Sequence, residues 1–223
     1  KYLNYARNII EYFLTHLQDG LIPNLFPEDE EQPRYNTVDA SLWLIEVFFR
    51  YWEVEELKKK HSLLAPVVQT WFKTSSEGSH PLWPLLKEII EGYATGTGHG
   101  IEMDEDALIS AGSEGTQLTW MDVKVDGHVP TPRHGKPVEI QGLWYNALRL
   151  MENAAREIPD PEAAERYSKL AARVQKSFEE RFIREGTAHL ADVVDRDGSG
   201  TADWAMRPNM VIPFWLEYNV VPE

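Results

Sequence analysis

The chain has 223 residues, of which 43% are hydrophobic and 26% are charged, a balance typical of a folded globular domain or of part of a larger one. Its formal net charge of −14, without a long run of Lys or Arg, argues against nucleic acid and against an anionic membrane surface as partners. The absence of cysteine excludes disulfide bonds, thiol catalysis and cysteine metal ligands.

Apolar residues recur at helical spacing in four segments near the start of the chain. The predicted helices cover about residues 1–17, 36–54, 63–74 and 82–93. The second of these helices carries an apolar stripe through Leu42 and Phe49 and a more polar stripe through Asp39 and Trp43. A helix with two such faces is expected in the wall of a helical barrel rather than at the surface.

Residues 96–136 form a long glycine-rich region, in which we predict a short hairpin with strands near residues 100–103 and 108–111. A loop region of this length inside a compact domain is usually functional. It is followed by two further helices, at 137–156 and 161–182, with Pro137 as the first helical residue.

The last part of the sequence predicts a second hairpin or loop at residues 189–203 and a seventh helix after Pro208. The helices do not alternate with strands as they would in a βαβ fold, so the pattern indicates an all-α class. We expect the long loops to gather at one end of the helices.

The segment YNTVDASLW, at residues 35–43, contains the first candidate site residues. Asp39 has a structural explanation, because an acid in the first turn of a helix is stabilised by the free N–H groups there. It also has a functional explanation, since Asp39 and Trp43 lie four residues apart on one helical face. Together they can offer a hydrogen-bond acceptor and a stacking ring to a sugar.

The segments LTWMD (118–122) and TPRHGKPVEI (131–140) contain the next candidates. Asp122 follows Trp120, and an acid beside an indole can lose solvation, which raises its pKa and suits it to donate a proton. An aspartate that only organises a turn is the alternative. Arg133 can clamp a carboxylate or cap a loop carbonyl, and Glu139 falls in the first turn of a helix.

The acidic segment DVVDRDGSGTAD, at residues 192–203, imitates the opening of a calcium loop, but the twelfth position from Asp195 is Met206 instead of a bidentate Glu. We therefore interpret it as an acidic turn. The RPNM that follows can bring Arg207 and Asn209 to a cleft, or it can simply begin a helix. The seven histidines are scattered without metal-ligand spacing.

Five of these segments occur together in one order: DGLIPNLFP (19–27), YNTVDASLW, LTWMD, TPRHGKPVEIQGLWYNAL (131–148) and RPN. As a set they resemble the glucosidase domain of glycogen-debranching enzymes, with the closest match to the archaeal and bacterial amylo-α-1,6-glucosidases. The resemblance implies an (α/α)6 toroid with its active site at the helix ends where the loops gather. It also implies a cytoplasmic enzyme without a cofactor, which hydrolyses α-1,6-linked glucose at the branch points of glycogen or limit dextrin with inversion.

Carried over by motif, Asp122 would be the general acid. The other matching positions would line the glucose subsite: Asp39, Trp43, Trp120, Arg133, Glu139, Arg207 and Asn209. An inverting hydrolase needs a second carboxylate, roughly 6.5–9.5 Å from the first, to activate water. The resemblance places this general base, a Glu, outside the present chain.

The predicted helices do not close such a ring. We therefore expect residues 1–223 to be part of a single catalytic domain that lacks N-terminal and C-terminal segments, or else an open half-barrel. In either case the chain alone would be inactive, and its exposed inner-helix faces would favour self-association.

Three alternatives to the debranching activity stay open. The chain could be a non-catalytic carbohydrate-binding helical domain, a related α-glucosidase on the same toroid, or a helical scaffold that binds protein.

Overall fold

The structure is a computed structural model that describes residues 2–28, 32–60, 82–158, 160–187 and 189–222. Within these residues it contains six α-helices and two small sheets. The helices are α1 (Tyr2–Leu14), α2 (Ala40–Lys60), α4 (Leu82–Thr95), α5 (Val138–Glu157), α6 (Pro161–Phe182) and α7 (Ile212–Trp215), with short 3-10 helices η1 (Gly98–Gly100) and η2 (Pro208–Val211). The helical class predicted from the sequence is confirmed, whereas the toroid stays a prediction. The helix predicted at 63–74 lies outside the described residues.

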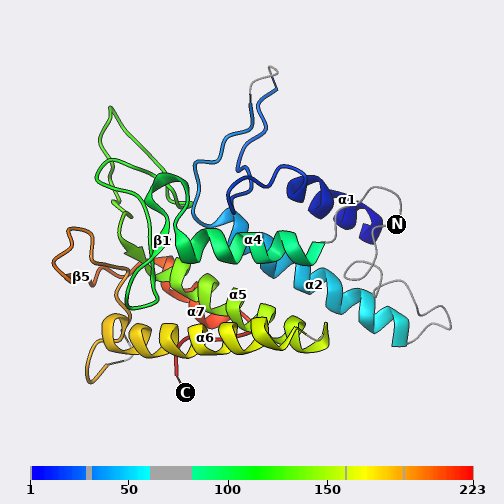
Figure 1. The fold of residues 1–223 in the computed structure, drawn as a ribbon. Coiled ribbons are helices and arrows are strands. Elements are labelled where there is room, and N and C mark those ends of the chain that lie inside the picture. Colours follow the sequence, from blue (N-terminus) through cyan, green and yellow to red (C-terminus); the bar gives the residue numbers. More distant parts are fainter. Residues whose placement is uncertain (1, 29–31, 61–81, 159, 188, 223) are drawn as a thin grey trace.

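Helix α5 lies at the centre of the fold. Sixteen of its 20 residues are buried, and it packs against α2, α6 and α7 (Figure 1). Helix α6 instead buries a single stripe that includes Tyr167, Val174 and Phe178, and its other faces are charged. This difference is the one expected between an internal helix and a covering helix.

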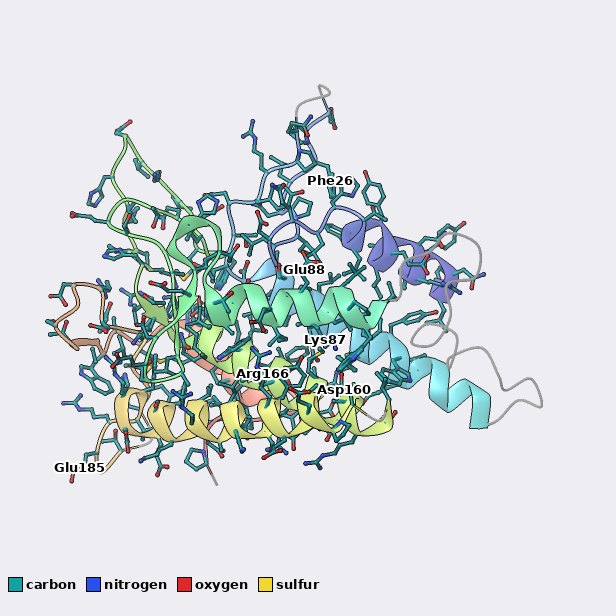
Figure 2. All side chains as sticks on the ribbon, in the orientation of Figure 1. Phe26, Lys87, Glu88, Asp160, Arg166 and Glu185 are labelled. Atoms are coloured by element: carbon teal, nitrogen blue, oxygen red, sulfur yellow. The ribbon has the colours of Figure 1, made fainter. Side chains whose placement is uncertain are left out.

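Helix α6 begins where the sequence predicts. Pro161 stands at its first position, and the Asp160 carboxylate accepts a hydrogen bond from the Ala163 N–H at 3.2 Å. The same carboxylate is paired with Lys87 of α4 at 3.1 Å (Figure 2). The cap of α6 thereby also links α6 to α4.

Two small sheets lie among the loops. Strands β1 (Glu102–Met103) and β2 (Ile109–Ser110) form the predicted first hairpin. Strands β4 (Val193–Val194) and β5 (Ala202–Asp203) form the predicted second one. Strand β3 (Lys136–Pro137) was not expected, and it pairs with β4 in a three-stranded sheet.

The prediction that Pro137 is the first helical residue is wrong. Pro137 has ψ 142° and pairs with Val193 in the sheet, so α5 begins one residue later. Proline fits this place because it has no N–H to offer to a ladder and a fixed φ that suits an extended residue just before a helix.

The loops that carry the sheets meet at one end of the helices. Helices α4 and α6 end there and α5 begins there, at the side of Figure 1 where β1 and β5 are labelled. Lys136 holds the loops together, because its buried ammonium is 2.8 Å from both Asp104 and Asp106 and 3.6 Å from Asp195. The loop end is thus a fixed structure on which side chains can be placed.

Gly20, in the DGLIPNLFP segment, lies against the backbone of α4. Its φ is +81°, and a Cβ on it would meet the Gly92 Cα at 2.9 Å and the Glu88 carbonyl oxygen at 3.1 Å. Glycine is therefore required at this position for two reasons: the backbone is left-handed, and α4 approaches it closely.

We predict that Gly20→Ala lowers the free energy of unfolding by about 3 kcal/mol, because backbone strain and a backbone clash add. Gly115→Ala is the matched control, since Gly115 has nearly the same φ, +80°, with open space around it. The control should lose only about 1 kcal/mol. Urea unfolding of the native protein, followed by circular dichroism, measures both, and equal losses would contradict the role of the close approach.

Candidate active site

The eight predicted site residues lie in one connected region at the loop end of the helices. The links between them run through hydrogen bonds, ion pairs, ring contacts and the short 117–123 segment. The region comprises Asp39, Trp43, Trp120, Asp122, Arg133, Glu139, Arg207 and Asn209, together with Asp192, which the sequence did not single out.

The start of α2 is set by the 117–123 segment. The Val38 N–H donates to the Leu118 carbonyl at 2.8 Å, outside the helix, and α2 begins only at Ala40. The predicted start at residue 36 or 37 is therefore too early, and Asp39 lies immediately before the helix rather than in its first turn.

The Asp39 side chain is 9% exposed and accepts a hydrogen bond from the Thr37 hydroxyl at 2.5 Å and another from the Trp120 backbone N–H. Burial raises the pKa of Asp39 above its usual value, although these hydrogen bonds oppose the rise. Asp39 thus joins the start of α2 to the segment that carries Asp122.

Trp43 lies one helical turn after Asp39. Its ring centroid is 6.2 Å from that of Trp215 in α7, with the two rings tilted by 53°. Trp215 is 64% exposed. The two indoles form an aromatic surface beside Asp39, and Trp215 is a part of it that sequence reasoning missed, because α7 was expected only as a seventh helix.

The 117–123 segment is closed on itself and anchored at its base. The Gln117 amide donates to the Val123 carbonyl at 2.9 Å, and the Asn36 amide donates to the Gln117 carbonyl at 3.1 Å. At the tip of the segment, the Trp120 indole N–H donates to the side-chain oxygen of Asn209, Oδ1, at 2.9 Å.

Asp122 is exposed to solvent on this segment. The prediction that the neighbouring indole removes its solvation is wrong, because the indole is bonded to Asn209 and leaves the carboxyl open to water. An exposed carboxyl at the tip of an anchored segment is accessible to a large substrate.

Below this surface lies a sealed ionic cluster. The Arg133 side chain is fully buried, with its Nε 3.0 Å from Glu139 Oε1, its Nη2 bonded to Glu139 Oε2, and its Nη1 2.5 Å from Asp192 Oδ2. Of the two roles that the sequence leaves open for Arg133, the structure shows the clamp, and it holds two carboxylates. Burial raises the pKa of Glu139 to about 7, against the opposing charge of Arg133.

Asp192 joins this cluster to the RPN segment. It is 0% exposed and accepts from Arg133, from Arg207 at 2.7 Å and from the Asn209 amide at 3.2 Å. The sequence contained one signal for it: an acid directly before the buried Val193 and Val194 needs cationic partners, and two candidate arginines were present.

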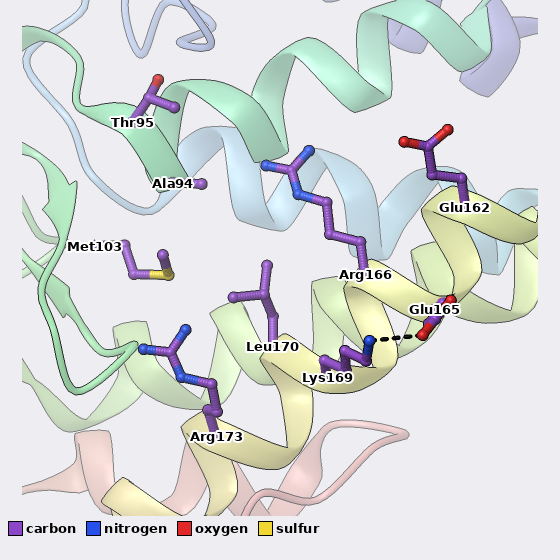
Figure 3. Close-up of a pocket in the computed structure, with 9 residues that line it drawn as sticks. All are labelled: Ala94, Thr95, Met103, Glu162, Glu165, Arg166, Lys169, Leu170 and Arg173. Atoms are coloured by element: carbon purple, nitrogen blue, oxygen red, sulfur yellow. Dashed lines mark ion pairs between the residues drawn. The ribbon is translucent and has the colours of Figure 1, made fainter.

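Cavities between the helices lie away from these eight residues. The one drawn in Figure 3, about 430 Å³, lies between α4, β1 and α6 and is lined by Met103, Arg166, Leu170 and Arg173 among others. None of the eight predicted residues lines it. In the part of the chain that the structure describes, no group of three His, Cys, Asp or Glu side chains could hold a metal ion, and no helix is long and apolar enough to cross a membrane.

The chain is similar in sequence and in fold to known proteins. The sequence model of the family described as "Amylo-alpha-1,6-glucosidase" matches residues 1–223. The glycogen debranching enzyme of Saccharomyces cerevisiae is 27% identical to the chain over an aligned length of 183, and the match covers 66% of this chain and 12% of that enzyme. The chain therefore spans about an eighth of the length of this relative.

Among solved structures, a rhamnosidase from Klebsiella oxytoca with rhamnose bound has a similar fold. The TM-score is 0.56 at 16% sequence identity, and the match covers 93% of this chain and 34% of the rhamnosidase chain. The likeness concerns the fold.

We predict that Arg133→Met lowers the free energy of unfolding by about 3–5 kcal/mol, because it leaves Glu139 and Asp192 buried without their shared cation. Lys169→Met is the control, since the Lys169–Glu165 pair is exposed and should contribute less than about 1 kcal/mol. Urea unfolding of the native protein measures both changes. A loss at Arg133 as small as the one at Lys169 would show that the cluster is not a structural element.

Proposed function

The chain belongs to the amylo-alpha-1,6-glucosidase family, and from this premise we propose that it is part of an inverting glycoside hydrolase that removes α-1,6-linked glucose at the branch points of glycogen or limit dextrin. The observation that carries the proposal is the placement of Asp122. Its exposed carboxyl stands on a segment that is hydrogen-bonded to Asp39 on one side and to Asn209 on the other.

We further propose that the helices belong to an (α/α)6 toroid, with α5 in its inner ring and α6 in its outer ring. The burial of α5 on nearly all faces and of α6 on one face supports this assignment. The proposed location is the cytoplasm, and the proposed substrate is a branched α-glucan. Self-association through the exposed apolar residues Val47, Phe214 and Trp215 is a further expectation of this architecture.

In this mechanism Asp122 protonates the glycosidic oxygen as the bond to the anomeric carbon breaks. Inversion also needs a general base, which takes a proton from water on the opposite face of the sugar. Glu139, whose pKa is raised by burial, is unsuited to the role of acid. It is buried and both its oxygens are bonded to Arg133, so it has no path to a sugar.

The remaining candidates divide into two groups. Trp43 and Trp120 offer ring faces on which a glucose can stack, and Asp39 offers carboxylate oxygens beside them. Arg133 and Glu139 are buried and paired with each other, so they support the site without being accessible to a sugar. Arg207 lies between these groups, since its side chain is partly exposed while it is bonded to Asp192 and Asp203.

We predict that Asp122→Asn in the intact native protein lowers kcat on an α-1,6-branched dextrin by about 10³-fold, because the amide cannot protonate the leaving oxygen. Maltooligosaccharide binding, followed by tryptophan fluorescence, should be unchanged. α-Glucosyl fluoride, whose leaving group needs little protonation, should be hydrolysed at a rate within about tenfold of the wild type.

Asp126→Asn is the matched control, because Asp126 is exposed in the same loop region and should have no effect on any of the three measurements. Full dextrin hydrolysis by Asp122→Asn would remove Asp122 as the acid. A wild-type protein that binds maltooligosaccharides and cleaves neither substrate would favour the non-catalytic carbohydrate-binding domain.

A further inference from the structure

The amide of Asn209 is fully engaged within the protein. Asn209 is 0% exposed. Its carbonyl oxygen accepts from the Trp120 indole at 2.9 Å, and its NH₂ donates to Asp192 Oδ1 at 3.2 Å and to Met121 Sδ at 3.2 Å. A sugar hydroxyl would have to displace one of these partners to reach it. Its place in the site is therefore better explained by what it holds than by a direct contact with substrate.

Asp192 determines which way this amide points. A carboxylate between two guanidinium groups offers only acceptors, so it selects the NH₂ end of Asn209. The carbonyl end is then left for the indole N–H, which is only a donor. The orientation of the amide follows from the chemistry of its two neighbours.

Asp192 is itself held by both its backbone and its side chain. Its N–H donates to the Asp203 carbonyl at 2.7 Å, and its carbonyl accepts from the Val138 N–H at 3.0 Å, so its backbone is held between β5 and the start of α5. The side chain is held by Arg133 and Arg207. Asp192 thus ties the position of Asn209 to the start of the central helix, α5.

Asp122 has a firm contact on either side of it in the sequence. Before it, Trp120 and Met121 are bonded to Asn209, and after it the Val123 carbonyl is bonded to Gln117. The exposed carboxyl between them takes its position from these neighbours.

We propose that Asp192 and Asn209 are positioning residues: Asp192 orients the Asn209 amide, and Asn209 holds the segment that presents Asp122 to the glycosidic oxygen. This inference rests on the proposed function. Its consequence is that loss of the Asn209–Trp120 bond impairs proton donation more than sugar binding, because a misplacement of about 1 Å can cost a catalytic group about 10²-fold in rate.

The test uses Asn209→Leu and Trp120→Phe, alone and together, in the intact native protein. The first variant removes both ends of the amide in similar volume, and the second removes the indole N–H but keeps a ring face. Each should lower kcat on an α-1,6-branched dextrin by about 10²-fold, with the kcat for α-glucosyl fluoride within about threefold of the wild type. Asn209→Leu should also leave KM within about threefold of the wild type. The double variant should be no slower than the slower single variant, since both substitutions remove the same Asn209–Trp120 hydrogen bond.

Asn153→Leu is the control, because it removes another amide–aromatic hydrogen bond, to the Tyr218 hydroxyl, at a place remote from Asp122 in the bonding network. Asn153→Leu should hydrolyse both the branched dextrin and α-glucosyl fluoride at the wild-type rate. If Asn209→Leu lowers both rates equally, its role is only structural and the inference fails. If it raises KM and spares kcat, Asn209 contacts the sugar and the inference also fails.

A wild-type protein that hydrolyses neither substrate would overturn the proposed function instead. Hydrogen exchange of residues 117–123 then decides the inference independently of activity. Faster exchange in Asn209→Leu than in Asn153→Leu supports the holding role of Asn209, and unchanged exchange overturns it.

Discussion

A buried carboxylate between two guanidinium groups is the interaction on which the loop end of this protein depends. Ions removed from water are stable only when their partners are close and their remaining hydrogen-bonding positions are filled. Asp192 meets this condition by accepting from Arg133, Arg207 and Asn209. These three donors come from two separate stretches of the chain, residues 131–140 and the RPN segment, so the folding of each stretch depends on that of the other.

The site therefore has two layers with different properties. The lower layer is dry and ionic, and it contains Arg133, Glu139 and Asp192. The upper layer is open to water and holds the aromatic rings and Asp122. Glycoside hydrolysis needs such a division, because the acid must be reached by a bulky polymer while its position is held to within fractions of an ångström. Asn209 connects the two layers, because it is bonded to Asp192 in the lower one and to Trp120 in the upper one.

Helical periodicity was sufficient to predict the described helices. It succeeded best for α6, where a proline start and one apolar stripe agree. It failed at the junctions between elements. Pro137 and the start of α2 were misplaced because each is governed by a bond to a distant strand or loop, to Val193 and to Leu118 respectively. No local pattern contains that information.

The same limit applied to the site. The sequence motifs identify the candidate residues, and the structure links these residues in one network of contacts. Asp192 was missed because its role comes from partners 15 and 59 residues away. The solvation of Asp122 was misjudged because the sequence places an indole beside it, whereas the fold directs that indole towards Asn209.

The most direct measurement of the central claim is an experimental structure of the intact native protein with a bound glucose-like iminosugar inhibitor. The account predicts the inhibitor ring against Trp43 or Trp120, within hydrogen-bond distance of Asp39, with the Asp122 carboxyl near its anomeric position and the Asn209–Trp120 bond intact. An inhibitor bound elsewhere, such as in the cavity between α4 and α6, with residues 117–123 untouched, would contradict it.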